Sequence, residues 1–247
     1  MPKPDARLRL FCFPYAGGAA SIYRTWSQSL PAEVDVVPVQ LPGRERRMGE
    51  KPFDRLLPLV RTLADVLAPY MDIPFAFYGY SNGALMSFEL ARELRRRGKP
   101  GPVHMFLAAC PAAHLPDKDQ PIHDLPDDEM IQDLRRLGGT PEEVLQNAEL
   151  MKLLLPLLRA DSAIHETYVY PEEPPLDVPI TAIGGTRDPK ADEAETEAWR
   201  VHTTGDFNLR IVDGDHFFIH SAQALVLRDL AQDLQGVLRR IRAPQRA

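Results

Sequence analysis

The sequence contains few cysteines, no excess of positive charge and no long apolar run. Its two cysteines, Cys12 and Cys110, are too few for a disulfide scaffold, and both lie in apolar runs that are typical of a buried core. The formal net charge of −6 argues against nucleic acid as the main partner. No apolar run reaches the roughly 18 residues of a membrane span, and the amino terminus has no apolar segment of signal-peptide length. We therefore expect a cytoplasmic protein that binds neither membrane nor nucleic acid.

Two further absences bear on cofactors and on the number of domains. The seven histidines and two cysteines are scattered rather than spaced as metal ligands, and no glycine fingerprint for a dinucleotide is present. We expect no metal and no resident cofactor. Internal repeats and low-complexity segments are also absent, and a length of 247 residues suits one large domain. We expect residues 1–247 to form a single domain that acts as a monomer.

Short apolar runs alternate along the chain with longer amphipathic segments. The runs predict buried strands at residues 8–13, 34–41, 75–80, 103–110, 180–184 and 207–212. The amphipathic segments predict helices at 21–30, 54–70, 84–97, 192–202 and 222–242, the first of them capped by Ser21. Such alternation is typical of parallel strands with helices on both faces. The sequence thus predicts an α/β fold with a mostly parallel sheet of about six to seven strands.

Residues 115–170 interrupt this alternation with a helical insertion. Helices are predicted at 126–137, 140–147 and 149–166. Thr140 and Glu143 have the spacing of a capping box, and Pro156 is expected to kink or divide the last helix. An insertion between strands of an α/β sheet is usually a lid over the carboxyl ends of the strands, where ligands bind. The alternative is a helical bundle that merely extends the core.

The motif G-Y-S-N-G at residues 79–83 places a candidate nucleophile, Ser81, between a predicted strand and a predicted helix. This is the context of a nucleophile elbow, in which flanking glycines permit a tight turn that exposes the serine hydroxyl. The helix that follows favours developing negative charge at its amino end. The alternative is an ordinary turn of glycine and serine.

A serine hydroxyl needs a base, and all seven histidines follow Ser81 in the chain. His216 is favoured because it comes directly after the last predicted strand, and His220 is its nearest rival, with a structural role expected. His104 lies inside a strand run and is expected to pack in the core. His202 falls at a helix end, where a positive charge would suit the helix dipole.

The base in turn needs an acid that orients its ring. Asp188 fits best, because it follows the predicted strand at 180–184 and precedes His216 by 28 residues. Asp213 and Asp215 are interpreted as turn-forming residues, Asp215 with less certainty. Asp161, in the insertion, is a weaker alternative.

The oxyanion of such a reaction requires two N–H donors. We expect one from the backbone of Asn82, directly after the nucleophile, and the other from Ala16 in the loop after the first strand, with Gly17 as the next choice. Consecutive glycines there allow the backbone to approach a substrate closely, although a plain turn is the alternative. We also expect Tyr15, Gly17 and Phe217 to contact the substrate.

Five stretches of the chain together resemble the type II thioesterases that accompany polyketide synthases and nonribosomal peptide synthetases. They read FPYAGGAAS at 13–21, VQLPGRE at 39–45, GYSNGA at 79–84, GGTRDP at 184–189 and GDHFFI at 214–219. The motifs occur in the right order and span nearly the whole chain. Animal medium-chain fatty-acyl thioesterases share them. One departure is Asn82, where the family more often has methionine.

This resemblance implies an α/β-hydrolase fold with a helical lid at residues 115–170. It implies Ser81, Asp188 and His216 as a catalytic triad that hydrolyses acyl thioesters on acyl or peptidyl carrier proteins, to edit or release chains in polyketide, peptide and antibiotic biosynthesis. The phosphopantetheine arm arrives on the carrier protein, so it is part of the substrate and not a cofactor.

Carrier proteins of this kind are usually acidic around the arm, and a basic cluster follows one predicted strand. Arg44, Arg46 and Arg47 lie at the edge where the site is expected, and we expect them to form a docking surface, with a solvated loop as the alternative. A second basic cluster at 92–99 lies at a helix end, where the helix dipole alone accounts for cations.

Two other functions remain open at this point. A carboxylesterase or lipase would use the same three side chains, because a triad does not distinguish oxygen esters from thioesters. A non-catalytic binding protein on this scaffold is disfavoured, because such proteins usually lose at least one residue of the triad.

Overall fold

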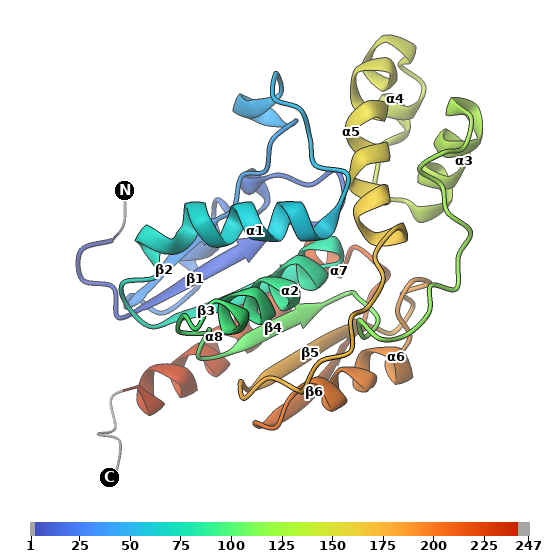
Figure 1. The fold of residues 1–247 in the computed structure, drawn as a ribbon. Helices are drawn as coiled ribbons and strands as arrows, with labels where there is room; N and C mark the ends of the chain where they lie inside the picture. The colour runs from blue at the N-terminus through green and yellow to red at the C-terminus, as the bar shows by residue number, and fades with distance from the viewer. Residues whose placement is uncertain (1–2, 242–247) are drawn as a thin grey trace.

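Six strands form one sheet in the computed structural model, which describes residues 3–241 (Figure 1). The strands are β1 (Leu8–Phe13), β2 (Val34–Pro38), β3 (Phe75–Tyr80), β4 (Met105–Ala108), β5 (Ile180–Gly185) and β6 (Phe207–Val212). Their order is β2-β1-β3-β4-β5-β6, and every neighbouring pair is parallel. The predicted α/β fold with a parallel sheet is therefore confirmed, with six strands.

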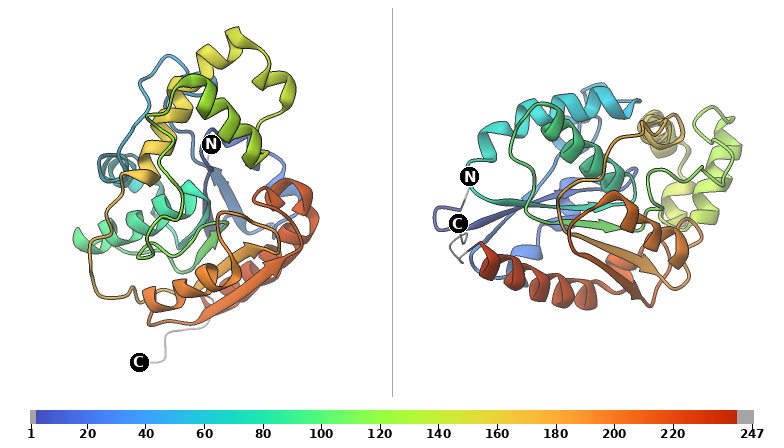
Figure 2. Two further views of the ribbon diagram at one scale, coloured as in Figure 1. Left: turned by 90° about the vertical axis from the view of Figure 1, so that its right-hand side faces the viewer. Right: turned by 60° about the horizontal axis from the view of Figure 1, so that its bottom comes forward.

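Helices cover both faces of this sheet (Figure 2). Helices α1 (Leu56–Leu67) and α2 (Asn82–Arg96) pack on one face, and α8 (Gln223–Arg240) packs on the other. On β1, Phe11 belongs to the core beneath α1 and α2, whereas the next residue, Cys12, belongs to the core beneath α8. Successive side chains of a strand point to opposite faces, so a strand covered on both faces needs a continuous apolar run.

The predicted helix at 21–30 is wrong. The segment forms two 3₁₀ turns, at Ala20–Tyr23 and Trp26–Gln28, and Ser21 is not a cap. The rings of Tyr23 and Trp26 are buried against each other, with centroids 4.8 Å apart. Tyr23 ends the first turn and Trp26 begins the second, so the contact between their rings packs the two turns together.

Other elements differ from their predicted ranges mainly at the ends. The segment at 192–202 begins as α6 (Glu193–Glu197) and finishes as a 3₁₀ helix, and a short helix, α7 (Phe218–Ser221), precedes α8. The predicted last residue of the final helix, Arg242, lies outside the described residues. So do residues 1–2 and 243–247 of the expected single domain.

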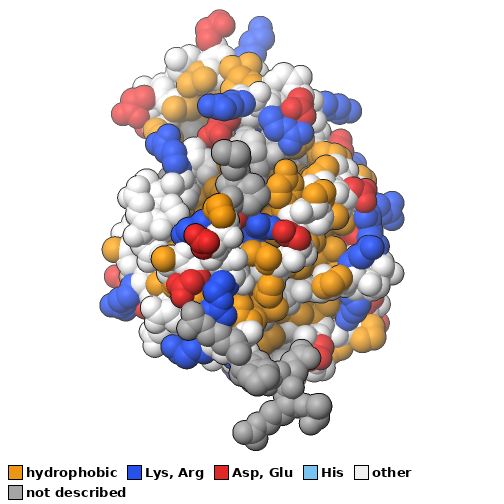
Figure 3. All heavy atoms as spheres, turned by 90° about the vertical axis from the view of Figure 1, so that its left-hand side faces the viewer, with side chains coloured by type: hydrophobic (Ala, Val, Ile, Leu, Met, Phe, Trp, Pro, Cys, Tyr) orange, Lys and Arg blue, Asp and Glu red, His pale blue; other side chains and the backbone are white. Residues whose placement is uncertain are grey.

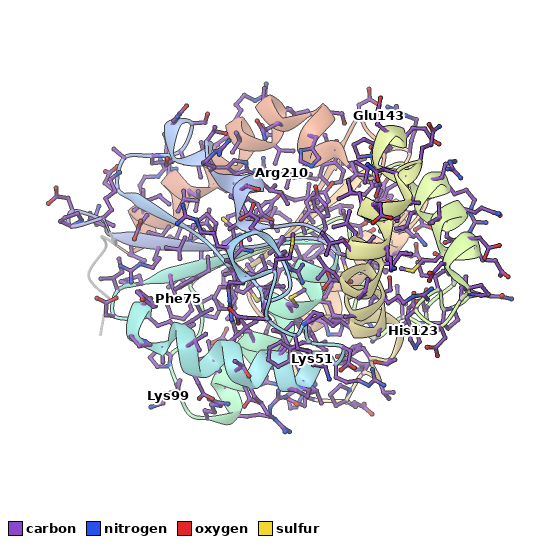
Figure 4. All side chains as sticks on the ribbon, turned by 90° about the horizontal axis from the view of Figure 1, so that it is seen from above. Lys51, Phe75, Lys99, His123, Glu143 and Arg210 are labelled. Carbon is purple, nitrogen blue, oxygen red and sulfur yellow. The ribbon has the colours of Figure 1, made fainter. Side chains whose placement is uncertain are left out.

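The insertion at 115–170 contains α3 (Asp127–Leu137), α4 (Glu142–Leu145) and α5 (Ala148–Glu166), and it stands beyond one end of the sheet (Figures 1 and 4). In Figure 4, His123 and Glu143 mark the insertion on the right, and Phe75 marks the start of β3 far to the left. The insertion has a small apolar core of its own, formed by Met130, Leu134, Leu145, Met151 and Leu155. Ile164 of α5 belongs instead to the main core, so the insertion packs on both cores and its role as a lid stays a prediction.

One local prediction for the insertion is wrong, and one of the two alternatives for Pro156, division of the helix, is excluded. Thr140 does not cap α4, which begins after Pro141 without a side-chain cap. Pro156 lies inside α5 without dividing it. A proline removes one backbone hydrogen bond, and in a helix of 19 residues the remaining bonds and the buried neighbours Leu155 and Leu157 hold the helix together.

His104 packs in the core, as predicted from its position in a strand run. Its ring stacks on Phe106, with centroids 4.4 Å apart, and its Nε2 lies 2.9 Å from the hydroxyl of Thr181. Burial, together with the positive charges of Arg240 and Arg210, lowers the pKa of His104 to about 3. The folded protein therefore holds this ring neutral, whereas the unfolded chain protonates it below about pH 6.5.

This difference predicts a loss of stability in acid. Between about pH 6.5 and pH 3 the unfolded state binds a proton at His104 that the folded state does not, so the free energy of unfolding falls as the pH falls. In His104→Gln, the slope of that free energy against pH should decrease by up to about 1.4 kcal/mol per pH unit in this window. Urea denaturation at a series of pH values measures the slope, and equal slopes for parent and variant would contradict the assignment.

Candidate active site

The turn between β3 and α2 holds Ser81 in a strained conformation, with φ of 53° and ψ of −120°. A Cβ atom on Gly83 would lie 2.1 Å from the carbonyl oxygen of Phe13, and one on Gly79 would lie 2.3 Å from that of Gly83. Both positions therefore accept only glycine. The structure has the tight elbow that the motif predicts, and a strained serine of this kind is typical of functional sites.

His216 lies between Ser81 and Asp188. Its Nε2 is 3.2 Å from the Ser81 hydroxyl, and its Nδ1 is 2.9 Å from each carboxylate oxygen of Asp188. Asp188 follows β5, His216 follows β6 and Ser81 follows β3, so the carboxyl ends of three parallel strands bring these residues together. His216 and Asp188 are 5 % and 7 % exposed. Such an arrangement can remove a proton from a serine hydroxyl and stabilise the imidazolium that forms.

Three hydrogen bonds that the sequence did not reveal fix this arrangement. The backbone N–H of Lys190 donates to Asp188 Oδ1 at 2.8 Å. The hydroxyl of Tyr80 donates to the carbonyl of His216 at 2.7 Å and accepts from the N–H of Ile219 at 3.2 Å. Burial raises the pKa of Tyr80, which keeps its donor proton in place. No local pattern in the sequence distinguishes these positions.

The alternative acids and the rival base are engaged elsewhere. Asp213 accepts from Thr186, Asp215 accepts from the N–H of Phe217 at 2.9 Å, and Asp161 is paired with Arg44. The ring of His220 is bonded to the hydroxyl of Tyr15 at 2.8 Å. These contacts agree with the turn-forming and structural roles expected of Asp213, Asp215 and His220.

Ala16 and Asn82 line the same cavity as Ser81 and His216. The N–H of Gly17, the alternative donor, is already bonded to the carboxylate of Asp161 at 2.7 Å. The geometry therefore favours Ala16 over Gly17 as the partner of Asn82 in binding an oxyanion.

Tyr15, Gly17 and Phe217 contact the insertion or one another rather than the cavity. Among the residues that line the cavity within 3–241, these three do not occur. The rings of Tyr15 and Phe217 pack edge to face with centroids 5.3 Å apart. A Cβ on Gly17 would lie 2.7 Å from Leu158, and one on Gly139 would lie 2.1 Å from the ring of Phe217. Gly17 and Phe217 therefore pack against the insertion, and the contact of all three residues with substrate stays a prediction.

The cavity has a volume of about 430 Å³ and lies between the sheet edge and the insertion. Its polar wall, which no pattern in the sequence predicts, includes His114, His165, Glu166, Tyr168 and Tyr170. Burial lowers the pKa of His165. The wall mixes apolar and hydrogen-bonding groups, so the cavity can accept an acyl chain that is not purely hydrocarbon.

His202 lies behind this wall, and its expected positive charge at a helix end is wrong. Its ring is buried, and its Nε2 lies 2.8 Å from Nδ1 of His114. Burial lowers the pKa of His202 to about 4, so the ring is neutral at pH 7.

The predicted docking surface at Arg44, Arg46 and Arg47 is only partly compatible with the structure. Arg44 is 4 % exposed and forms a bidentate pair with Asp161, so its assignment to a surface is wrong. Arg47 bonds to Glu50 and to the carbonyl of Gln40. Arg46 is exposed and lines a shallow surface groove with Arg24. In the second basic cluster, Arg92, Arg95, Arg96 and Arg97 all pair with acidic side chains.

Within residues 3–241, no three His, Cys, Asp or Glu side chains gather into a group that could hold a metal ion. Of the helices that the structure describes, none combines the length and apolarity that crossing a membrane requires.

Comparisons with known proteins agree with this geometry. The family model for the thioesterase domain matches residues 8–234. The chain is 48 % identical over 237 residues to the protein named linear gramicidin dehydrogenase LgrE of Brevibacillus parabrevis, a match that covers 95 % of this chain and 90 % of LgrE.

Two solved structures are also similar. The thioesterase RedJ from the prodiginine biosynthetic pathway of Streptomyces coelicolor has a TM-score of 0.86 and 42 % identity, over 92 % of this chain and 90 % of RedJ. The type II thioesterase BorB from the borrelidin biosynthetic cluster has a TM-score of 0.84 and 36 % identity, over 93 % of each chain. The chain therefore belongs to the thioesterase family and has the α/β-hydrolase fold.

Proposed function

We propose that this protein is a serine thioesterase that hydrolyses acyl groups from phosphopantetheinyl carrier proteins, in order to edit or release chains in polyketide or nonribosomal peptide biosynthesis. One observation carries the proposal: the ring of His216 lies within hydrogen-bond distance of both Ser81 and Asp188. Membership of the thioesterase family and the similarity to RedJ and BorB support the thioester as the bond that is broken.

In the proposed mechanism the Ser81 hydroxyl attacks the thioester carbonyl while His216 Nε2 accepts its proton. The negative charge on the tetrahedral intermediate is stabilised by the backbone N–H groups of Ala16 and Asn82. Asp188 orients the ring of His216 and stabilises its protonated form. The pantetheine thiol departs, and His216 then activates water to cleave the acyl-enzyme ester on Ser81. A thiol has a pKa near 8.5, so its departure requires less acid assistance than that of an amine.

The function is tested by incubating the protein with several acyl-carrier proteins and measuring the loss of the acyl group by mass spectrometry. We expect release from acylated carriers, and a higher kcat/KM on acyl-pantetheine thioesters than on p-nitrophenyl esters of the same acyl chain. A preference for the oxygen esters would instead support a carboxylesterase or lipase.

Arg46 is the member of the first basic cluster that remains suited to docking an acidic carrier protein. It is exposed, it follows the carboxyl end of β2 and it lies beside Arg24 in the surface groove. On the face turned away from the insertion, Lys, Arg, Asp and Glu side chains are interspersed among apolar ones (Figure 3). Charge complementarity mainly raises the rate at which two proteins associate. Loss of the positive charge at Arg46 should therefore lower kcat/KM for the carrier-bound substrate alone.

In Arg46→Glu, the kcat/KM for an acyl-carrier protein should fall about three- to tenfold, while turnover of a small acyl thioester stays unchanged. Steady-state kinetics at low ionic strength on both substrates measure this difference. Arg228→Glu is the matched control, because Arg228 is an exposed arginine on α8. Equal kinetics for Arg46→Glu and the parent on the carrier-bound substrate would remove Arg46 from the docking surface.

A further inference from the structure

The insertion carries a buried carboxylate, Asp161 on α5, that the proposed mechanism does not use. Asp161 is 1 % exposed. Its atoms contact three segments that lie far from it in the sequence: the loop after β1, the loop after β2 and the first residue of α2. Burying a carboxylate is costly unless it is paired and hydrogen-bonded, so contacts of this number indicate a specific role.

The carboxylate holds the loop that follows β1. Its Oδ2 accepts the N–H of Gly17 at 2.7 Å. This N–H belongs to the peptide that joins Gly17 to Ala16, so fixing it limits how the neighbouring N–H of Ala16 can turn. Leu158, one turn earlier on α5, fills the space where a side chain on Gly17 would lie.

The backbone of Asp161 holds the other side of the oxyanion site. Its carbonyl accepts from the side-chain Nδ2 of Asn82 at 2.6 Å. Asn82 is the first residue of α2, and its own backbone N–H is the second expected donor. One residue of the insertion therefore contacts both segments that supply the oxyanion donors.

Arg44 fixes Asp161 in turn. Its Nη1 and Nη2 each lie 2.8 Å from a different carboxylate oxygen, and Nη1 also donates to the carbonyl of Gly18 at 3.0 Å. A bidentate pair of this kind sets orientation as well as distance. The pair thus joins α5 to the loops after β1 and β2.

We infer that Asp161, held by Arg44, is a positioning residue that keeps the N–H groups of Ala16 and Asn82 aimed at the oxyanion. The inference rests on the proposed function, because it assigns the oxyanion to these two donors. It makes the insertion a part of the framework of the active site, since displacement of α5 would release both donors at once.

The test compares kcat and KM on a small acyl thioester, so that carrier docking does not enter. In Asp161→Asn, kcat should fall about 10- to 100-fold while KM changes less than threefold, because the donors act mainly in the transition state. In the double variant Arg44→Met with Asp161→Leu, apolar groups replace the buried ion pair. Its Tm should rise above that of Asp161→Asn toward the value of the parent. Its kcat should nevertheless stay low, because Gly17 has lost its acceptor.

Asp35→Asn is the matched control, since Asp35 pairs with the buried Arg9 at the opposite end of the sheet. It should lower Tm without lowering kcat more than twofold. If kcat of the double variant returns to the parent value together with Tm, Asp161 has only a structural role and the inference is overturned.

If the parent does not hydrolyse thioesters, the proposed function fails, and the rate at which a fluorophosphonate labels Ser81 decides the role of Asp161. Should Asp161→Asn not fold, the double variant carries the test.

Discussion

Replacing Ser81 with alanine is expected to lower thioester turnover by about 10⁴-fold or more, because no other group takes over the attack on the carbonyl. The fold should be retained, since alanine is smaller than serine. The lost hydroxyl lines the cavity and contacts His216 there. Turnover of an acyl-pantetheine thioester gives the rate, and circular dichroism and Tm confirm the fold. A fluorophosphonate should label the parent and not the variant.

Ser87→Ala is the control for this experiment. Ser87 lies on α2, the helix that follows Ser81, is fully buried and donates to the carbonyl of Ala84 at 2.9 Å, so its loss should affect stability rather than turnover. Hydrolysis retained by purified Ser81→Ala would defeat the assignment of the nucleophile, and with it the proposed mechanism.

Replacing Asp188 with asparagine is expected to lower kcat by about 10³- to 10⁴-fold with little change in KM. Both carboxylate oxygens lie 2.9 Å from Nδ1 of His216, which keeps the proton on Nδ1 and leaves Nε2 free to accept the proton of Ser81. An amide at this position can donate to Nδ1 instead, which favours the tautomer with the proton on Nε2. That tautomer cannot act as a base toward the serine.

Asp213→Asn is the matched control, because Asp213 is an exposed carboxylate in the turn just before His216 and bonds to Thr186 and Arg187. Its kcat should stay within twofold of the parent value. If Asp188→Asn and Asp213→Asn have equal effects on kcat, the acid has been assigned to the wrong residue.

The strands, their parallel direction and the elbow could be predicted because each depends on short-range patterns. A strand covered on both faces needs a continuous apolar run, and the elbow needs glycines on both sides of Ser81. His216 and Asp188 could be placed because residues that directly follow parallel strands meet at one edge of the sheet.

The features that could not be predicted depend on contacts between residues that lie far apart in the sequence. Arg44 and Asp161 are 117 residues apart, and the arginine could be identified as buried only once α5 was placed over the loop that contains it. The rings of Tyr15 and Phe217 pack against each other, and Phe217 also packs against Gly139 of the insertion, contacts that no local pattern predicts. The two 3₁₀ turns that contain Tyr23 and Trp26 likewise stand where the pattern of the segment predicts one helix.

The separate apolar core of the insertion has a consequence for the evolution of substrate preference. Met130, Leu134 and Met151 pack with one another and not with the sheet, so mutations around them can reshape the acyl-binding wall while the scaffold beneath keeps its stability. We expect such mutations to be tolerated less well at Asp161, because its contacts position the oxyanion donors. Substitutions in the part of the insertion far from Asp161 can therefore change the preferred acyl group while the catalytic residues stay the same.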